Sequence, residues 1–424
     1  MDSDVYRRLN YVSRQLLQTC EANPVLDQVL LRTGQLQERE EATESVIIGG
    51  MVLDIHAIPS VPPNPRTTIP GKVNYVLGGV ARNVAECMSK LGAKPYMISA
   101  VGVDMAGNVL LEHWKSAGLS TEGIRRQKDI DTAVVCNILD ANGEVAAGVA
   151  GVEAIEKFLT PEWIRLFNRN ISFAPMVMVD ANLSPPALEA SCQMAAEYNI
   201  PVWFEPVSVT KSRRISSVVK YISVTSPNED ELVAMANALT GENTFHPISR
   251  DKHSTESLFQ MLKPAICVLL EKDVKLVVVT LGPDGVFLCS KASPSSMRFG
   301  QGITKQHGFS ETLYKTVTSR CPSIQYSGAM QPGGGSQIFA VHFPALPASV
   351  VRVTGAGDCL VGGTLASICA GLDVMQSVAV GIAAAKAAVE AEINVPSEFN
   401  LAAIADDAKT VYAAAKVLFH RSML

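Results

Sequence analysis

The 424-residue sequence lacks several patterns that assign proteins to common classes. It has no run of 18 uncharged apolar residues, so we expect no membrane-spanning helix. The N-terminal segment MDSDVYRRLN is charged and has no apolar stretch, so a secretory signal is not expected either. The net charge is −5 and there is no basic block. We therefore expect neither nucleic acid nor a membrane as a partner.

Cysteine pairs and common nucleotide-binding signatures are also missing. The sequence has nine cysteines but no CxxC pair, which favours reduced core thiols in an intracellular protein. No GxGxxG motif follows the first expected strand, and this opposes a nicotinamide enzyme. Because GxxxxGK[ST] is absent too, nucleotide binding cannot be of the P-loop type.

Apolar strands and helices alternate along most of the chain. Strands are expected at VIIGGMVLDIHA, PYMISAVG, MVMVDANL, PVWFEP, YISVTSPN and KLVVVTLG. Helices are expected at 107–117, 186–198, 228–239 and from Asp358 onward. Continuous β-branched runs that alternate with helices are typical of a parallel sheet covered on both faces. The sequence therefore predicts an α/β fold with a mostly parallel central sheet.

Two β-rich segments interrupt this alternation and are expected to form a small separate sheet that acts as a lid. They cover about residues 60–76 and 132–150, and the second contains a turn at 141–143. Residues 291–345 are rich in Ser, Pro and Gly and are expected to form a surface insertion.

The two ends of the chain differ from the domain between them, which is expected to span residues 46–400. Residues 1–45 are polar, with periodic Leu and Val, and predict a helical extension. Residues 401–424 predict a C-terminal helix and tail. The last three residues, Ser422, Met423 and Leu424, have the small–x–Leu form of a peroxisomal address. Peroxisomal localisation is therefore expected, with the cytosol as the alternative because Met replaces the usual Lys.

The segment VTGAGDCLVGG carries the strongest chemical pattern. Gly355, Ala356 and Gly357 precede Asp358, and an apolar helix follows at once. Small residues let a ligand approach the backbone, and the unpaired N–H groups of a first helical turn attract anions. Asp358 could accept a proton from a hydroxyl held against that anion. The alternative is a tight turn in which the aspartate only caps the helix.

Two further motifs follow expected strands in the second half of the chain. Asn228 and Glu231 form N-x-x-E, which suits Mg²⁺ with several retained waters but also suits a simple helix cap. Thr280, Gly282 and Gly285 belong to TLGPDG, a glycine turn at the carboxyl edge where parallel sheets bind nucleotides. By itself this motif is an ordinary β-turn.

Candidate sugar-binding residues lie mainly in the first half. Asp54 ends a strand, Gly78 and Gly79 precede Asn83 at a helix start, and Asn182 ends another strand. A carboxylate and an amide on a glycine-lined surface match vicinal hydroxyls. The alternatives are a solvated strand end for Asp54, a satisfied cap for Asn83 and a loop amide for Asn182.

Taken together, these motifs resemble a known family. Their order and spacing are similar to those of ribokinase-like (PfkB-type) carbohydrate kinases over about residues 46–400. The motifs are GGMVLD, GGVARN at 78–83, GVDMAG at 102–107, SPNEDE at 226–231, TLGPDG at 280–285 and TGAGD at 354–358. Within the family, VVCNILDANGEV, VEAIEKFLTPE, VDANLSP and VTGAGDCLVGG are most similar to pseudouridine kinases of the plant type. The resemblance implies a three-layer α/β/α fold with a small β-sheet lid.

The resemblance also implies roles for the candidate residues. Asp358 falls on the family's general base, and Gly355, Ala356 and Gly357 fall on its anion hole. Two sets match the nucleotide side and the acceptor side of the family's site. The nucleotide and Mg²⁺ set is Asn228, Glu231, Thr280, Gly282 and Gly285, with Glu231 acting on the metal through water; the acceptor set is Asp54, Gly78, Gly79, Asn83 and Asn182. One departure is Arg352-Val353, where the family often has Asp-Thr, so activation by a monovalent cation is doubtful.

The resulting expectation is an ATP- and Mg²⁺-dependent kinase that phosphorylates the 5′-hydroxyl of pseudouridine. The alternatives are a kinase of another ribosyl substrate, such as ribose or adenosine, and a non-catalytic relative that acts as a scaffold. Exposed lid strands also predict pairing between two copies, so a homodimer is a further hypothesis.

Overall fold

The computed structural model describes residues 44–62, 66–140, 145–241, 243–248, 254–291, 297, 299, 309–323 and 338–420. These residues belong to the unit Glu44–Leu424, so the expected N-terminal extension lies outside them except for its last two residues. Among the described helices, none is both long and apolar enough to cross a membrane.

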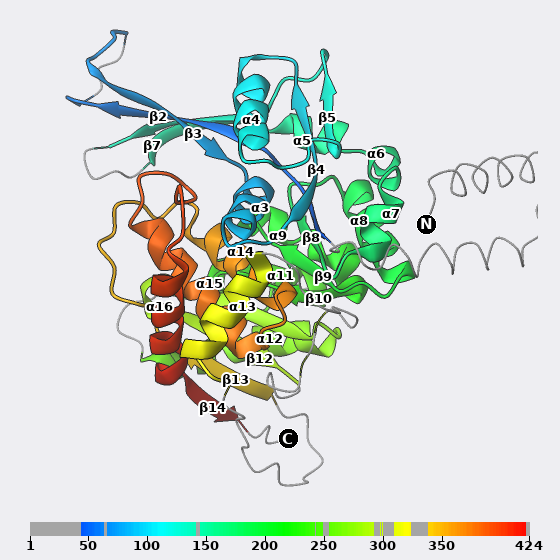
Figure 1. The fold of residues 1–424 in the computed structure, drawn as a ribbon, viewed down its shortest axis with the longest axis vertical. Helices are drawn as coiled ribbons and strands as arrows, with labels where there is room; N and C mark the ends of the chain where they lie inside the picture. Colours follow the sequence, from blue (N-terminus) through cyan, green and yellow to red (C-terminus); the bar gives the residue numbers. More distant parts are fainter. Residues whose placement is uncertain are drawn as a thin grey trace, which may run out of the picture. The chain divides into compact units, whose positions relative to one another are not determined.

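The main sheet has ten strands in the order β14-β13-β12-β11-β10-β9-β8-β1-β4-β5 (Figure 1). Neighbouring strands from β5 to β11 pair in parallel, and β12, β13 and β14 are added antiparallel. This confirms the predicted α/β fold with a mostly parallel central sheet. The strands are β1 (Ser45–Ile48), β4 (Pro95–Gly102), β5 (Ile124–Gln127), β8 (Val177–Asp180), β9 (Val202–Glu205), β10 (Ile222–Thr225), β11 (Leu276–Thr280), β12 (Val286–Ser290), β13 (Ile338–Phe343) and β14 (Lys416–His420).

Helices cover both faces of this sheet because successive strand residues point in opposite directions. In β1, Ile47 packs into one buried cluster, while Val46 and Ile48 pack into the other. The first cluster is covered by α3 (Val80–Lys90), α4 (Met105–Ser116), α13 (Phe309–Arg320), α14 (Ala356–Cys369), α15 (Val374–Val389) and α16 (Leu401–Ala414). The second is covered by α5 (Glu153–Phe158), α6 (Pro161–Arg165), α7 (Asn168–Phe173), α8 (Pro185–Glu197), α10 (Ile215–Val218), α11 (Glu229–Thr240) and α12 (Thr255–Glu271). The short elements α9 (Val209–Ser212), η1 (Val219–Tyr221) and η2 (Gly282–Asp284) lie in connections.

A separate four-stranded sheet has the order β3-β2-β6-β7, and its strands are β2 (Val52–Pro59), β3 (Gly71–Gly78), β6 (Val134–Leu139) and β7 (Val145–Gly151). The first of these strands begins at Val52, earlier than the boundary near residue 60 that the sequence predicts. The reason is that Gly49 and Gly50 divide one apolar run between two sheets, β1 in the main sheet and β2 in the small one. The turn expected at 141–143 lies outside the described residues.

The prediction that residues 291–345 form a surface insertion is wrong for the parts that the structure describes. Helix α13 buries Leu313 and Val317 in the first cluster, and β13 pairs with both β12 and β14. The short apolar run of β13 was hidden by the Ser, Pro and Gly residues around it. The predicted C-terminal tail also differs, since β14 follows helix α16 and ends the main sheet at one edge.

The strand order reverses between β1 and β8. From β1 the chain continues to β4 and β5 on one side, whereas β8, β9, β10 and β11 follow one another on the other side. A reversal of this kind leaves a crevice outside the carboxyl ends of the two strands, where α/β proteins bind ligands. Gly49 and Asn182 follow β1 and β8 closely, so both lie at this crevice.

Helix α14 packs unusually close to its neighbours through glycines. A Cβ atom on Gly362 would lie 2.7 Å from Cys87 Cβ and 2.8 Å from Val84 O of α3. A Cβ atom on Gly381 of α15 would lie 2.5 Å from Leu360 O. Glycine at these positions therefore sets the distance between α14 and the helices on either side.

We predict that Gly362→Ala destabilises the fold, because its methyl group must push α3 and α14 apart. Overpacking costs about 1–3 kcal/mol, and the better helix propensity of alanine offsets up to about 1 kcal/mol of it. The free energy of unfolding, measured by urea titration, should therefore fall by about 1–2 kcal/mol. Gly151→Ala is the matched control, since its Cβ would meet only Val134 O at 3.6 Å. Equal stability of the two variants would contradict the prediction.

Candidate active site

Gly355 shapes the backbone at the start of helix α14. It is the N-cap residue, with a φ of 85°, and a Cβ atom there would lie 2.3 Å from Asn394 O. Both the positive φ and the close approach require glycine. Around Gly357, by contrast, a Cβ would meet no atom within 4 Å, so the backbone here is open to a ligand. The first turn of α14 has no side-chain cap. Its N–H groups are therefore not used by a capping side chain, which is a condition for the predicted anion site.

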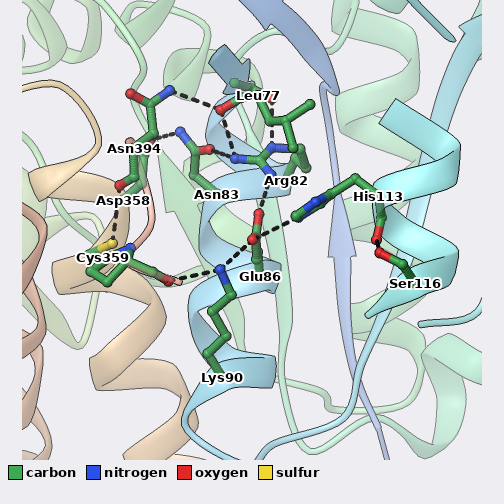
Figure 2. A network of polar contacts seen from close by, with 12 residues as sticks. Leu77, Arg82, Asn83, Glu86, Lys90, His113, Ser116, Asp358, Cys359 and Asn394 are labelled. Carbon is green, nitrogen blue, oxygen red and sulfur yellow. Dashed lines mark hydrogen bonds and ion pairs between the residues drawn. The ribbon is translucent and has the colours of Figure 1, made fainter. Parts of the chain in front are cut away.

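Asp358 lies in this first turn and faces helix α3. Its Oδ2 accepts a hydrogen bond of 2.6 Å from Asn83 Nδ2 (Figure 2). Burial, together with the charges of Asp180 and Asp54, raises the pKa of Asp358 to about 6, although Asn83 and Arg82 oppose the rise. Asp358 is not the N-cap, so the alternative reading of this motif does not describe the structure. The arrangement is a carboxylate that exchanges its proton close to neutral pH.

Arg82 fixes the orientation of Asn83. Its Nη2 donates to Asn83 Oδ1 and, at 2.9 Å, to Leu77 O, while its Nε donates to Gly78 O at 2.9 Å. Because Oδ1 of Asn83 is occupied in this way, its Nδ2 is left to face Asp358 (Figure 2). Arg82 is buried and was not singled out by the sequence, where it is one arginine within an amphipathic helix.

The charge of Arg82 is balanced by Glu86, one turn further along α3. Glu86 also accepts from Lys90 Nζ at 2.5 Å and contacts His113 Nε2 at 2.9 Å (Figure 2). These partners outweigh the effect of burial and hold the pKa of Glu86 at about 2. Burial lowers the pKa of Arg82 while Glu86 raises it, and a guanidinium stays charged under such conditions.

The predicted acceptor residues Asp54, Gly78, Gly79 and Asn83 come together at the start of α3. A Cβ atom on Gly78 would lie 2.2 Å from Asp54 Oδ2, and Gly79 has a φ of 96°. Asp54 Oδ2 accepts from Asn394 Nδ2 at 3.4 Å, and the same amide donates to Leu77 O at 3.0 Å. Burial raises the pKa of Asp54.

Asn182 lies at the end of β8 with two partners that the sequence did not single out. Its Oδ1 accepts from Lys211 Nζ at 2.6 Å, and its backbone N–H donates to Asp180 Oδ1 at 3.0 Å. Asp180 is fully buried and also accepts from the backbone of Gly50 at 3.0 Å. Asp180 is the last residue of an apolar strand, and this position was the sequence feature that could have identified it as a site residue.

On the other side, Asn228 and Glu231 form a capping box for α11. Asn228 Oδ1 accepts from Glu231 N, and Glu231 Oε2 accepts from Asn228 N, both at 2.9 Å. The N-x-x-E motif therefore forms a helix cap, which was the alternative interpretation of this motif. Asn228 also bridges to Thr280 in a parallel register. These residues thus lie at the ends of the neighbouring strands β10 and β11.

The glycines of TLGPDG form a tight turn after β11. Gly282 has a φ of 57° and Gly285 a φ of 94°. A Cβ atom on Gly285 would lie 2.0 Å from Phe343 O, so the turn can pack against β13 only with glycine there.

Glu205 is a carboxyl group that lies near Glu231, Asp358 and Asp180. It ends β9 and accepts a hydrogen bond from Ser226. Burial raises the pKa of Glu205 well above its usual value, and the charges of Glu231, Asp358 and Asp180 raise it further. Carboxylates of the nucleotide set, of α14 and of the end of β8 therefore all lie near Glu205.

The comparisons with known proteins identify the family. The family model described as pfkB family carbohydrate kinase matches residues 42–302 and 335–394. The chain belongs to this family. A pseudouridine kinase of Arabidopsis thaliana is 55% identical over 384 residues, covering 90% of this chain and 100% of the relative. A pseudouridine kinase of Escherichia coli (strain K12) is 26% identical over 243 residues, covering 57% of this chain and 71% of the relative.

Solved structures of pfkB-type kinases share the fold. The ribokinase of Arabidopsis thaliana, solved with ribose and ATP, has a TM-score of 0.62 at 19% identity. The likeness covers 87% of this chain and 99% of that one. This confirms the ribokinase-like fold that the motifs predicted. The family match and the 55% identical relative identify the chain as a kinase that transfers a phosphoryl group to a hydroxyl.

We predict that Glu86→Gln strongly destabilises this kinase, because it leaves the buried Arg82 without its counter-charge. Breaking a buried ion pair costs about 3–5 kcal/mol, and the free energy of unfolding in urea should fall by about that amount. Glu153→Gln is the control, since Glu153 pairs with Lys157 on the surface, where ion pairs contribute little. A small effect of Glu86→Gln, equal to that of the control, would show that Arg82 does not depend on this partner.

Proposed function

We propose that this chain is an ATP-dependent pseudouridine kinase that phosphorylates the 5′-hydroxyl. The observation that carries this proposal is the 55% identity to a pseudouridine kinase over the whole length of that relative. The site supports it, since Asp358 stands at the open start of α14, between the acceptor set and the nucleotide set.

In this proposal, Asp358 accepts the proton of the 5′-hydroxyl as the oxygen attacks the γ-phosphorus in line. A pKa of about 6 keeps the carboxylate mostly ionised at neutral pH, yet makes it a stronger base than an exposed aspartate. The backbone N–H groups of Gly355, Ala356 and Gly357 stabilise charge on the transferring phosphoryl group. Asp54 and Asn83 hold the sugar, and Asn83 also orients Asp358.

ATP and Mg²⁺ are proposed for the nucleotide set. No cluster of three or more possible metal ligands exists among the described residues. This fits Mg²⁺, which is usually held by substrate phosphates and water with only one or two carboxylates. Glu231 keeps one oxygen on the Asn228 backbone, so its other oxygen is the one that suits a metal-bound water. The metal would neutralise charge on the phosphates.

The small sheet is proposed to act as a lid and to pair two copies of the chain. Its edge strands are β3 and β7, and Val73, Tyr75 and Val149 on them are exposed by more than half. Exposed apolar edge strands favour pairing with another chain. Closure over the sugar would exclude water from the phosphoryl group and limit hydrolysis of ATP.

Two expectations stay predictions. Peroxisomal localisation depends on Ser422, Met423 and Leu424, which lie outside the described residues. The doubt about a monovalent cation depends on Arg352, whose charge lies near Asp54 and Glu392.

The proposal is tested by measuring ADP release with pseudouridine, uridine, adenosine and ribose side by side. We expect kcat/KM for pseudouridine to exceed the others by more than about tenfold, which is about 1.4 kcal/mol of selectivity. Phosphorus NMR of the product should place the new phosphate on the 5′-oxygen. A preference for ribose or adenosine would support the alternative acceptors, and no turnover with any of them would favour the scaffold.

A second prediction concerns the pH dependence of the reaction. Because the ionised form of Asp358 is the active one, kcat/KM should fall as the pH drops below about 6. Asn83→Leu removes a hydrogen bond that stabilises the ionised form, so the acid limb should move up by about 1–2 pH units. Asp358→Asn should lower turnover by about 10²–10⁴-fold and leave ATP binding, measured by calorimetry, largely intact. An acid limb that does not move in Asn83→Leu would assign it to another group.

A further inference from the structure

Three buried polar atoms near Asp54 have no hydrogen-bond partner within the described part of the chain. They are His56 Nδ1, Arg352 Nη1 and Asn394 Oδ1. Buried polar groups are almost always paired, so each such atom requires an explanation. His56 is only 5% exposed and Asn394 only 1%, which makes the cost of leaving them unpaired considerable.

These atoms belong to one region. His56 lies two residues after Asp54 on β2, so both side chains are on the same face of the small sheet. Asn394 donates its amide to Asp54 at 3.4 Å. The charge of Arg352 lowers the pKa of both Asp54 and His56, which places its guanidinium near the two. The small sheet, the loop before α14 and the connection between α15 and α16 therefore contribute to the same surroundings.

The unpartnered atoms differ in what they offer. Arg352 Nη1 can only donate, and Asn394 Oδ1 can only accept. Burial lowers the pKa of His56, so its ring is neutral and carries one donor and one acceptor nitrogen. Sugar hydroxyls are already matched by Asp54 and Asn83. A mixed set of donors and acceptors suits a group in which N–H and C=O stand side by side.

We propose that His56, Arg352 and Asn394 form a subsite for the N–H and C=O edge of a heterocyclic base carried by the acceptor riboside. This inference rests on the proposed function, because it takes the acceptor to be a riboside bound through Asp54. His56 aligns with Asn137 of β6 in the register of the small sheet, so a second amide side chain lies beside it. Selection for a base-bearing riboside over a plain sugar is thus a property of the region next to Asp54.

The test compares two acceptors that share the ribose ring. Pseudouridine carries a base, whereas methyl β-D-ribofuranoside has the same free 5′-hydroxyl and none. Arg352→Met removes a charged donor. It should therefore lower kcat/KM for pseudouridine by about 10- to 100-fold and change that for the methyl riboside by less than about threefold. Arg165→Met is the matched control, since Arg165 is exposed and forms an ion pair with the exposed Glu162, and it should alter neither value.

Substitutions of His56 provide a second test that does not remove a charge. His56→Leu should lower the preference for pseudouridine, and His56→Gln, which keeps a donor and an acceptor, should restore part of it. Equal losses with both acceptors would assign these residues a structural role, and no loss would remove them from the site. Wild-type protein assayed in parallel separates the two proposals. If the wild-type protein does not phosphorylate pseudouridine, the proposed function fails. The variants are then compared on the methyl riboside and on uridine or adenosine, whichever the wild-type protein phosphorylates.

Discussion

The hydrogen bond between Asn83 and Asp358 is the contact on which the site depends. It joins α3, which follows the small sheet, to α14, which carries the expected anion hole. The bond is directional because Arg82 occupies the other end of the Asn83 amide. Arg82 in turn binds the main-chain oxygens of Leu77 and Gly78 at the end of β3. One buried guanidinium therefore sets the relative positions of the turn at Gly78, which is proposed to face the sugar, and the carboxylate at α14.

A buried charge of this kind is tolerated only when its donors are used and its charge is balanced. Glu86 provides the balance, and Lys90 and His113 hold Glu86 ionised. Arg82 forms its ion pair with Glu86, and its positive charge also attracts the carboxylates of Asp358 and Asp54. Asp358 thus keeps a raised pKa beside an arginine, because desolvation and the neighbouring carboxylates outweigh the attraction.

The sequence predicted the parts of the site that the backbone itself requires. Gly79, Gly285 and Gly355 have positive φ values, and short motifs reveal such positions because other residues are excluded from them. Arg82, Asp180 and Asn394 were missed for the opposite reason. The partners of Asn394 are distant in the sequence, and so is Gly50, a partner of Asp180. The partners of Arg82 are local, but an arginine in a helix has many ordinary roles. The sequence did identify the N-x-x-E motif. A capping box and a site for Mg²⁺ use the same residue types, however, so the motif alone did not distinguish these two roles. In the fold, β13 was overlooked because a strand of six residues within a Ser-, Pro- and Gly-rich region gives too short a pattern.

The order of strand ends explains how one edge of the sheet accommodates two reactants. Thr280 ends β11 and Asn228 follows β10, whereas Asp180 ends β8 and Gly49 follows β1, with β9 between the two groups. Neighbouring strands lie about 4.8 Å apart, so β11 and β1, four steps apart, are separated by about 19 Å. That span suits a nucleotide triphosphate and a riboside placed end to end. Glu205 ends the intervening strand β9, between the strand ends that carry the two groups. Burial and the neighbouring carboxylates raise the pKa of Glu205 well above its usual value, and this reduces the negative charge that a polyphosphate would meet at the end of β9.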